Sequence, residues 1–164
     1  MRASIRQVRA DDVLRCIEVE VRCFPPTEAA SPERVRLRAE QFPQGFLVAV
    51  DEDGTIVGLV MSGATPKEDI SDEGLKELIG HDPTGAHAVV FSVAVVPELQ
   101  GRGLGRQLLE DFAAQARQAG RESVLLLCKA PLVPFYQRLG YRDLGRSAST
   151  HGGAAWHQMK LPLT

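Results

Sequence analysis

Hydrophobic and polar residues follow regular patterns along most of this chain. Near the N-terminus, alternation over residues 5–9 predicts a short strand, and helical spacing over residues 13–24 predicts a helix that Asp11 or Asp12 could cap. The apolar positions that predict its buried stripe are Val13, Leu14, Ile17, Val21 and Phe24. Pro25-Pro26 ends this helix, because proline lacks the amide donor and restricts the residue before it.

A second helix and a hairpin follow. Ser31 before Pro32 predicts a helix start, with serine as the cap and proline at the first helical position. Two apolar, β-branched runs, residues 46–50 and 55–61, flank an acidic turn that ends in Gly54, which predicts a β-hairpin.

The second half of the chain alternates strands and helices. The strongest strand pattern covers residues 89–96, and a glycine run and an amphipathic helix that Gly120 closes follow it directly. Further predicted elements are a helical piece at 75–79, a buried strand at 123–128, a short helix at 131–139, and strands at 141–144 and 154–161. This order predicts a mixed α/β (α+β) fold, with residues 1–164 forming a single domain.

The glycine run after the strongest strand is suited to holding an anion. A helix N-terminus offers unpaired amides and a partial positive charge, and glycine lets the backbone approach closely. The chain has no P-loop string, and a dinucleotide fingerprint fails because Arg106 occupies its third glycine position. The pattern Gln/Arg-x-x-Gly-x-Gly is matched by Gln100, Gly103 and Gly105. A plain strand-to-helix turn is the alternative.

Two further segments make this loop specific. Val93-Ala94-Val95 leads into it, and Leu132-Val133-Pro134-Phe135-Tyr136-Gln137-Arg138-Leu139-Gly140-Tyr141 stands further on. Together these segments resemble the GNAT superfamily of acetyltransferases, and more narrowly the arylalkylamine (serotonin) N-acetyltransferases and their microbial relatives. The resemblance implies a GNAT fold: a mixed, mostly antiparallel sheet with two splayed parallel central strands and about four flanking helices.

The resemblance also implies acetyl-CoA as the cosubstrate and an amine as the acceptor. Backbone groups of Val93, Ala94 and Val95 would meet the pantetheine arm. The residues that would bind the pyrophosphate are Gln100, Gly101, Arg102, Gly103, Leu104, Gly105 and Arg106. Lys129 stands where many members carry an asparagine toward the cofactor arm. No metal is expected to take part.

Proton transfer in such a reaction needs a donor for the departing thiolate and a route for the amine proton. Tyr136 matches the position of the family's general acid, although a tyrosine can also simply pack its ring in a core. The two histidines that the animal serotonin enzymes carry on the strand are replaced by Val89 and Phe91. His87 and Glu28 are the candidate bases, and each could instead be an ordinary surface residue.

The acceptor pocket implied by the resemblance is apolar, which would suit an aryl or alkyl amine. Its residues would be Phe24, Pro25, Leu127, Leu132 and Pro134, which could equally form plain core. Cys128 offers a covalent alternative, but a cysteine at the end of a buried strand usually only packs.

Composition limits the other function classes. The 164 residues carry a net charge of −2, so the chain lacks the overall positive charge that would favour binding to nucleic acid or to a membrane. Three cysteines without a C-x-x-C pair, and no apolar leader, predict a cytoplasmic protein. The expected oligomeric state is a monomer or a homodimer. Two alternatives stay open beside acetylation of a small amine: a protein lysine or N-terminal acetyltransferase, and a non-catalytic acyl-CoA-binding protein.

Overall fold

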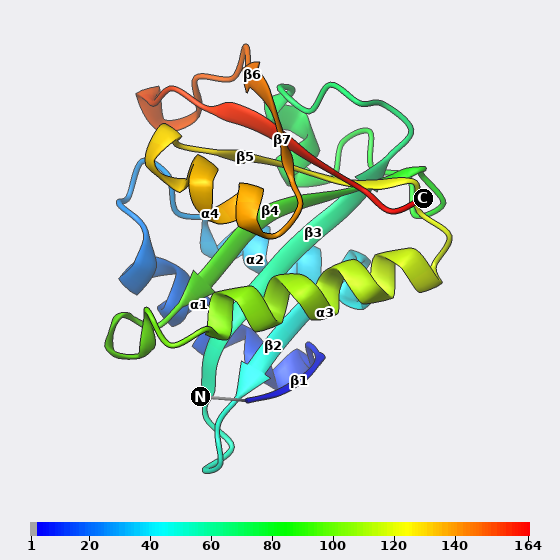
Figure 1. Ribbon diagram of the computed structural model, residues 1–164. Helices are drawn as coiled ribbons and strands as arrows, with labels where there is room; N and C mark the ends of the chain where they lie inside the picture. The colour runs from blue at the N-terminus through cyan, green and yellow to red at the C-terminus, as the bar shows by residue number, and fades with distance from the viewer. Residues whose placement is uncertain (1–2) are drawn as a thin grey trace. The chain divides into compact units, whose positions relative to one another are not determined.

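The computed structural model describes residues 3–164. Over this range the chain forms seven strands and four α-helices (Figure 1). The strands are β1 Ser4–Gln7, β2 Phe46–Val50, β3 Ile56–Thr65, β4 His87–Val95, β5 Ser123–Cys128, β6 Arg142–Arg146 and β7 His157–Pro162. The helices are α1 Val13–Cys23, α2 Pro32–Gln41, α3 Leu104–Gln118 and α4 Val133–Arg138. Most of the boundaries predicted from sequence lie within a few residues of these.

The strands form one sheet in the order β1-β2-β3-β4-β5-β7-β6, in which β4 and β5 are a parallel pair. This mixed, mostly antiparallel sheet with four helices confirms the predicted fold class. The chain divides into two compact units, residues 1–62 with 92–112, and residues 63–91 with 113–164. Strands β3 and β4 and helix α3 each contribute residues to both units.

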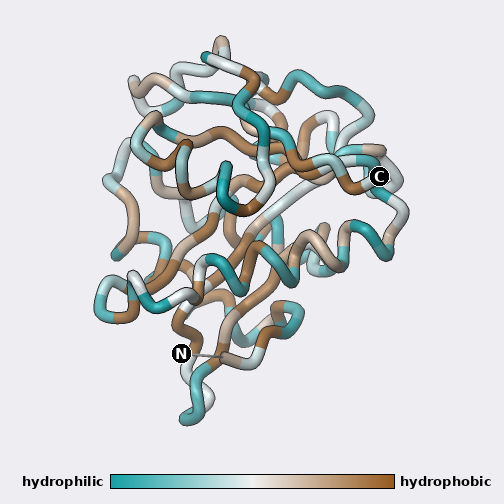
Figure 2. The backbone as a smooth tube through the Cα atoms, viewed as in Figure 1, coloured by the Kyte–Doolittle hydropathy of each residue, from teal (hydrophilic) through white to brown (hydrophobic). Residues whose placement is uncertain are grey.

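The first unit holds the hairpin and the two N-terminal helices. Strand β2 pairs antiparallel with β1 and with β3, as the sequence predicted for the hairpin, and the β2–β3 turn is hydrophilic (Figure 2). Helix α1 buries Cys16, Val19 and Glu20, whereas Leu14 and Val21 are 73% and 63% exposed. The predicted apolar stripe was therefore wrong for these two residues. The buried face of α1 includes a glutamate, which hydrophobic spacing cannot anticipate.

Two helix caps differ in outcome. Ser31 caps α2 as predicted, because its hydroxyl accepts a hydrogen bond from the Arg34 amide at 3.2 Å. Asp12 precedes α1 but makes no side-chain cap. Its carboxylate instead accepts from Arg6 at 2.7 and 3.1 Å and from the Arg9 amide at 2.7 Å. The ion pair with Arg6 therefore ties β1 to the residue just before helix α1.

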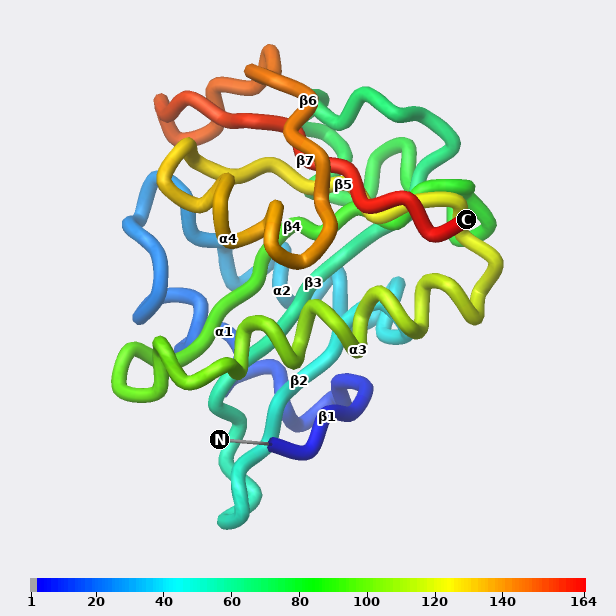
Figure 3. Tube along the Cα trace, in the orientation of Figure 1, coloured from blue at the N-terminus to red at the C-terminus, as the bar shows by residue number. Residues whose placement is uncertain are grey.

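The second unit contains the C-terminal strands. Strand β7 lies between β5 and β6 and pairs antiparallel with both. In Figure 3, β7 is red, β5 yellow and β6 orange. The parallel β4–β5 pairing runs from His87 with Ser123 to Val90 with Leu126. The β3–β4 connection contains a short 3-10 helix, Glu73–Glu77, in place of the helical piece predicted at 75–79. Apolar residues of this connection pack on the sheet in a cluster of Ile70, Leu75, Val89 and Leu125.

Candidate active site

The glycine run leads directly from β4 into α3 (Figure 1). Gly101 and Gly103 have φ values of 78° and 86°, in the left-handed region that favours glycine. A Cβ on either would meet no heavy atom within 4 Å, and a Cβ on Gly105 would come only to 4.0 Å from the Val95 side chain. The first turn of α3 also lacks intrahelical acceptors for its amides. The loop is thus an open backbone surface with donors and a favourable helix dipole, and it fits a pyrophosphate.

Side chains around the loop also make contacts within the protein. The side-chain amide of the exposed Gln100 donates to the Val95 carbonyl at 2.9 Å, which links the loop to the strand end. Arg106 pairs with Glu110 one turn along α3. Arg102 is exposed in the loop. The loop's own backbone amides therefore offer the donors for an anion, and Arg102 offers a nearby positive charge.

Strand β4 presents backbone groups in alternation. The Val96 amide donates to the Val57 carbonyl on β3 at 2.9 Å. The Ala94 carbonyl also faces β3, because a Cβ on Gly58 would lie 3.0 Å from it. By strand alternation, the backbone groups of Val93 and Val95 point to the opposite edge. Since the Val95 carbonyl already accepts from Gln100, Val93 is the residue of this set whose backbone best fits a pantetheine arm.

The segment after α1 carries the predicted acceptor residues Phe24, Pro25 and Glu28. Pro25 is exposed, and Phe24 and Glu28 are half-buried. The amides of Glu28 and Ala29 both donate to the Pro25 carbonyl at 2.9 Å, which folds the segment into a tight turn. These residues belong to the same unit as the glycine loop and Val93.

Tyr136 lies in α4, in the second unit, with 8% of its surface exposed. Its ring meets Phe135 and Tyr141 edge-on, with centroids 5.1 and 5.5 Å away. Burial raises the pKa of Tyr136 well above its ordinary value, with a smaller contribution from Cys128. The phenol is therefore protonated throughout the neutral range, as a proton donor must be. Burial also raises the pKa of the Cys128 thiol to about 11, which disfavours the covalent route.

His87 is the first residue of β4 and is 5% exposed. Its Nδ1 lies 2.6 Å from the Ser123 hydroxyl, on the residue that opens β5. This pairing holds the beginnings of the two parallel strands together. The geometry favours a structural role for His87 over proton transfer to a substrate.

The predicted apolar pocket residues of the second unit differ in exposure. Leu127 is half-buried and packs against the cluster that includes Val89 and Leu125, together with Phe91. Leu132 is 49% exposed, and Pro134 is exposed as well. Leu127 therefore has core neighbours, whereas Leu132 and Pro134 are available to a ligand.

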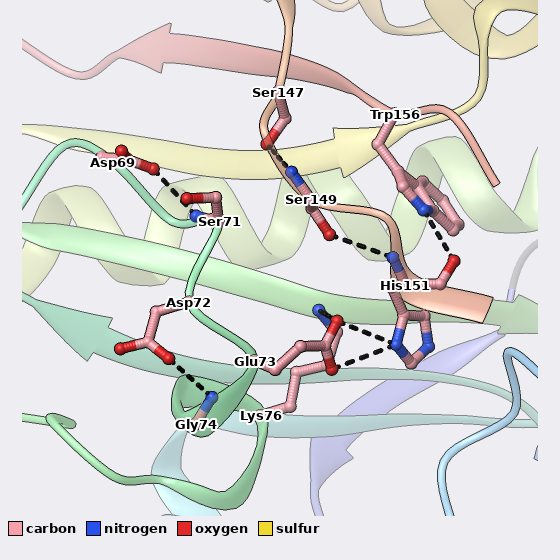
Figure 4. Close-up of polar contacts among 10 residues, drawn as sticks. All are labelled: Asp69, Ser71, Asp72, Glu73, Gly74, Lys76, Ser147, Ser149, His151 and Trp156. Carbon is pink, nitrogen blue, oxygen red and sulfur yellow. Dashed lines mark hydrogen bonds and ion pairs between the residues drawn. The ribbon is translucent and has the colours of Figure 1, made fainter. Parts of the chain in front are cut away.

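Lys129 belongs to a polar cluster that sequence patterns did not predict. Its ammonium lies 5.7 Å from the centre of the Trp156 ring, and the Trp156 indole donates to the His151 carbonyl at 3.0 Å. The His151 ring points at the Glu73 carboxylate, 3.1 Å away, which also faces Lys76 (Figure 4). These contacts join the β3–β4 connection to the β6–β7 loop. No sequence motif marks His151 or Glu73, since their pairing spans 78 residues.

Within the described residues 3–164, histidine, cysteine, aspartate and glutamate side chains form no group that could hold a metal ion. Within the same range, every helix is too short or too polar to cross a membrane.

Known proteins resemble this chain in sequence and in fold. Residues 13–141 match the acetyltransferase (GNAT) family. The chain belongs to the GNAT acetyltransferase family. This membership confirms the resemblance on which the loop and Tyr136 were assigned, and it confirms the prediction of an acetyltransferase enzyme.

Individual GNAT relatives differ in how much of the chain they cover. Serotonin N-acetyltransferase of Mesocricetus auratus is 27% identical over 165 residues, covering 98% of this chain and 78% of the relative. Mycothiol acetyltransferase of Arthrobacter sp. (strain FB24) is 34% identical over 102 residues, covering 60% of this chain and only 28% of the relative. The GNAT-like decarboxylase GphF, solved with isobutyryl-CoA, has a TM-score of 0.82 at 22% identity, covering 98% of this chain and 100% of that one. That likeness establishes the GNAT fold.

Proposed function

We propose that this protein transfers the acetyl group of acetyl-CoA to a small primary amine of the aryl or alkyl class. The observation that carries the proposal is the glycine loop, in which Gly101 and Gly103 adopt left-handed φ and side-chain space is open. The binding of isobutyryl-CoA by GphF on the same fold supports a CoA thioester as the donor. The serotonin N-acetyltransferase relative, aligned along 98% of the chain, supports an arylalkylamine as the acceptor.

The donor side of the reaction uses backbone and tyrosine. Acetyl-CoA supplies an acetyl thioester, which an amine attacks directly. In this proposal the loop amides bind the pyrophosphate, the Val93 backbone meets the pantetheine arm, and backbone amides of the same strand stabilise the developing oxyanion. The hydroxyl of Tyr136 donates a proton to the departing thiolate, which a raised pKa permits across the neutral range.

The acceptor side uses the segment after α1. We assign Glu28 to bind the substrate ammonium or take its proton through water, with Phe24 and Pro25 as apolar neighbours. We also assign Leu132 and Pro134 to the acceptor as apolar residues, and Lys129 to the donor side. His87 is kept as the second candidate base. In this proposal the two compact units act together as one acetyltransferase domain in the cytoplasm, where the free Cys16, Cys23 and Cys128 would stay reduced.

A thiol-release assay with acetyl-CoA tests the proposal. The acceptor panel contains arylalkylamines, linear polyamines and short peptides with a free N-terminus or a lysine. Turnover of an arylalkylamine or alkylamine, with kcat/KM at least about tenfold above that of the peptides, is expected. Preferential turnover of peptides would show a protein acetyltransferase. Tight acetyl-CoA binding without turnover of any amine would show a non-catalytic acyl-CoA-binding protein.

A further inference from the structure

Glu20 is a buried carboxylate that the proposed chemistry does not use. It lies in α1 with 2% of its surface exposed. The Ser92 hydroxyl donates to it, 2.9 and 3.1 Å from its two oxygens, and the Ala30 amide donates at 3.2 Å. Burial raises the pKa of Glu20, while these two hydrogen bonds and the charge of the equally buried Arg38 lower it. Such a group is costly to bury, so its hydrogen bonds matter to the local structure.

The segment after α1 begins and ends on this one residue. The Phe24 amide donates to the Glu20 backbone carbonyl at 3.2 Å, and the Ala30 amide donates to the Glu20 carboxylate. Residues 24–30 therefore form a closed loop with both ends fixed on Glu20. Phe24 and Glu28, which we assign to the acceptor amine, lie inside this loop.

The same carboxylate reaches strand β4. Ser92, its hydroxyl donor, immediately precedes Val93, whose backbone points to the edge of the strand opposite β3. Two further contacts join the end of α1 to this part of the chain. The Cys23 thiol donates to the Val95 carbonyl at 3.2 Å, and Arg22 pairs with Glu98 at 2.6 Å. Glu20 alone among these three contacts also fixes the far end of the loop, at Ala30.

We propose that Glu20 is a positioning residue for the acceptor: its carboxylate holds the 24–30 loop at a fixed place relative to the Ser92–Val93 segment of β4. The loop carries the groups for the amine, and the strand carries the backbone for the thioester. One buried carboxylate therefore sets the place at which the amine binds relative to the thioester, and a small displacement would weaken productive binding of the amine. This inference rests on the proposed acetyl transfer.

Ser92→Ala is the test variant, because it removes the strand's bond to Glu20 and leaves the Glu20 and Arg38 charges together. Ser62→Ala is the matched control. Ser62 is also a buried serine of the same unit, and its hydroxyl donates to the Gly45 carbonyl at 2.6 Å, away from the 24–30 loop. Glu20→Ala would remove the negative charge beside the buried Arg38 and could fail to fold, so the two serine variants are used for the test.

The first measurement is kinetic. Ser92→Ala should raise the KM of the amine about tenfold while the Kd of acetyl-CoA changes by less than about twofold. Ser62→Ala should change neither constant, although its melting temperature should fall by about as much as that of Ser92→Ala. An equal KM in the two variants would overturn the proposal.

The second measurement does not depend on activity. Hydrogen–deuterium exchange of the peptide that contains Ala30 should become at least about tenfold faster in Ser92→Ala than in the wild type, and stay unchanged in Ser62→Ala. Unchanged exchange in Ser92→Ala would overturn the proposal. If no amine is turned over by the wild type, the proposed function fails, and the exchange measurement still decides whether Glu20 holds the loop.

Discussion

The ring of Tyr136 meets the ring of Tyr141 edge-on, with centroids 5.5 Å apart and planes at 72°. Gly140 lies between them in the chain, and there the chain turns with a φ of 96° after α4. Tyr136 is the phenol that the GNAT resemblance assigns as acid, and Tyr141 holds its ring in one orientation. A proton donor whose ring is fixed by packing is positioned before the substrate arrives.

Tyr136→Phe should lower kcat by about 10²-fold, because the departing thiolate loses its proton donor. The phenylalanine keeps the ring contacts with Phe135 and Tyr141, so the Kd of acetyl-CoA and the melting temperature should stay near wild-type values. Steady-state thiol release and calorimetry measure these quantities. A kcat within about threefold of wild type would remove Tyr136 from the mechanism.

Tyr141→Phe should raise the free energy of unfolding by about 1 kcal/mol, or leave it unchanged. The hydroxyl of Tyr141 is buried and has no hydrogen-bond partner within the described residues 3–164, so its removal relieves a desolvation cost. Urea denaturation measures the difference. A loss of about 1 kcal/mol or more would show that the hydroxyl has a partner in solution.

Gly105→Ala should weaken acetyl-CoA binding by at least about tenfold without loss of fold. Its Cβ has open space, 4.0 Å from the Val95 side chain, but it stands where an anion would approach the first turn of α3. Gly103→Val is a less clean test, because a φ of 86° strains any side chain.

Gly54→Ala is the control for the glycine loop, since Gly54 has a φ of 82° in the β2–β3 turn with open space around it. It should lose stability through backbone strain and bind acetyl-CoA normally. Isothermal titration compares the variants. Normal affinity in Gly105→Ala would refute the pyrophosphate assignment.

Glu28→Gln should lower kcat/KM for the amine by about tenfold to 10²-fold. His87→Gln should instead lower stability, because the buried His87 ring pairs with Ser123 at 2.6 Å. Glu33→Gln, at an exposed glutamate in the first turn of α2, is the control. If His87→Gln alone lowers kcat/KM for the amine while the melting temperature stays at the wild-type value, the two roles are reversed.

Asp12→Asn should destabilise the protein by about 1–2 kcal/mol at pH 7. The Arg6 hydrogen bond, with the Arg9 amide, holds the pKa of the Asp12 carboxyl below its ordinary value of 3.8. A lowered folded-state pKa contributes stability that is present above 3.8 and is lost as pH falls through the folded value. The gap between wild type and variant in urea denaturation should therefore close below pH 3.8. A gap that persists in acid would contradict the charge-based account.

The sequence predicted those elements best whose signals are local. Ser31 caps α2 through an amide three residues away, and β5 has the bounds expected of its apolar run. The glycine loop is also local, since strand, turn and helix follow one another directly. The burial of α1 was less predictable. Leu14 and Val21 fit helical spacing and yet face solvent, because the buried face of α1 runs through Cys16, Val19 and Glu20.

The amino-acid sequence by itself determined the fold class, the family and the loop, because each depends on residues close together in the chain. Tertiary structure decided which groups meet. It paired Glu20 with Ser92 across 72 residues, His151 with Glu73 across 78, and His87 with Ser123 across 36. Spacing cannot reveal such pairs, since a polar side chain far along the chain changes no local pattern. They form because a polar group that folding removes from water must find its partner wherever the packed chain brings one.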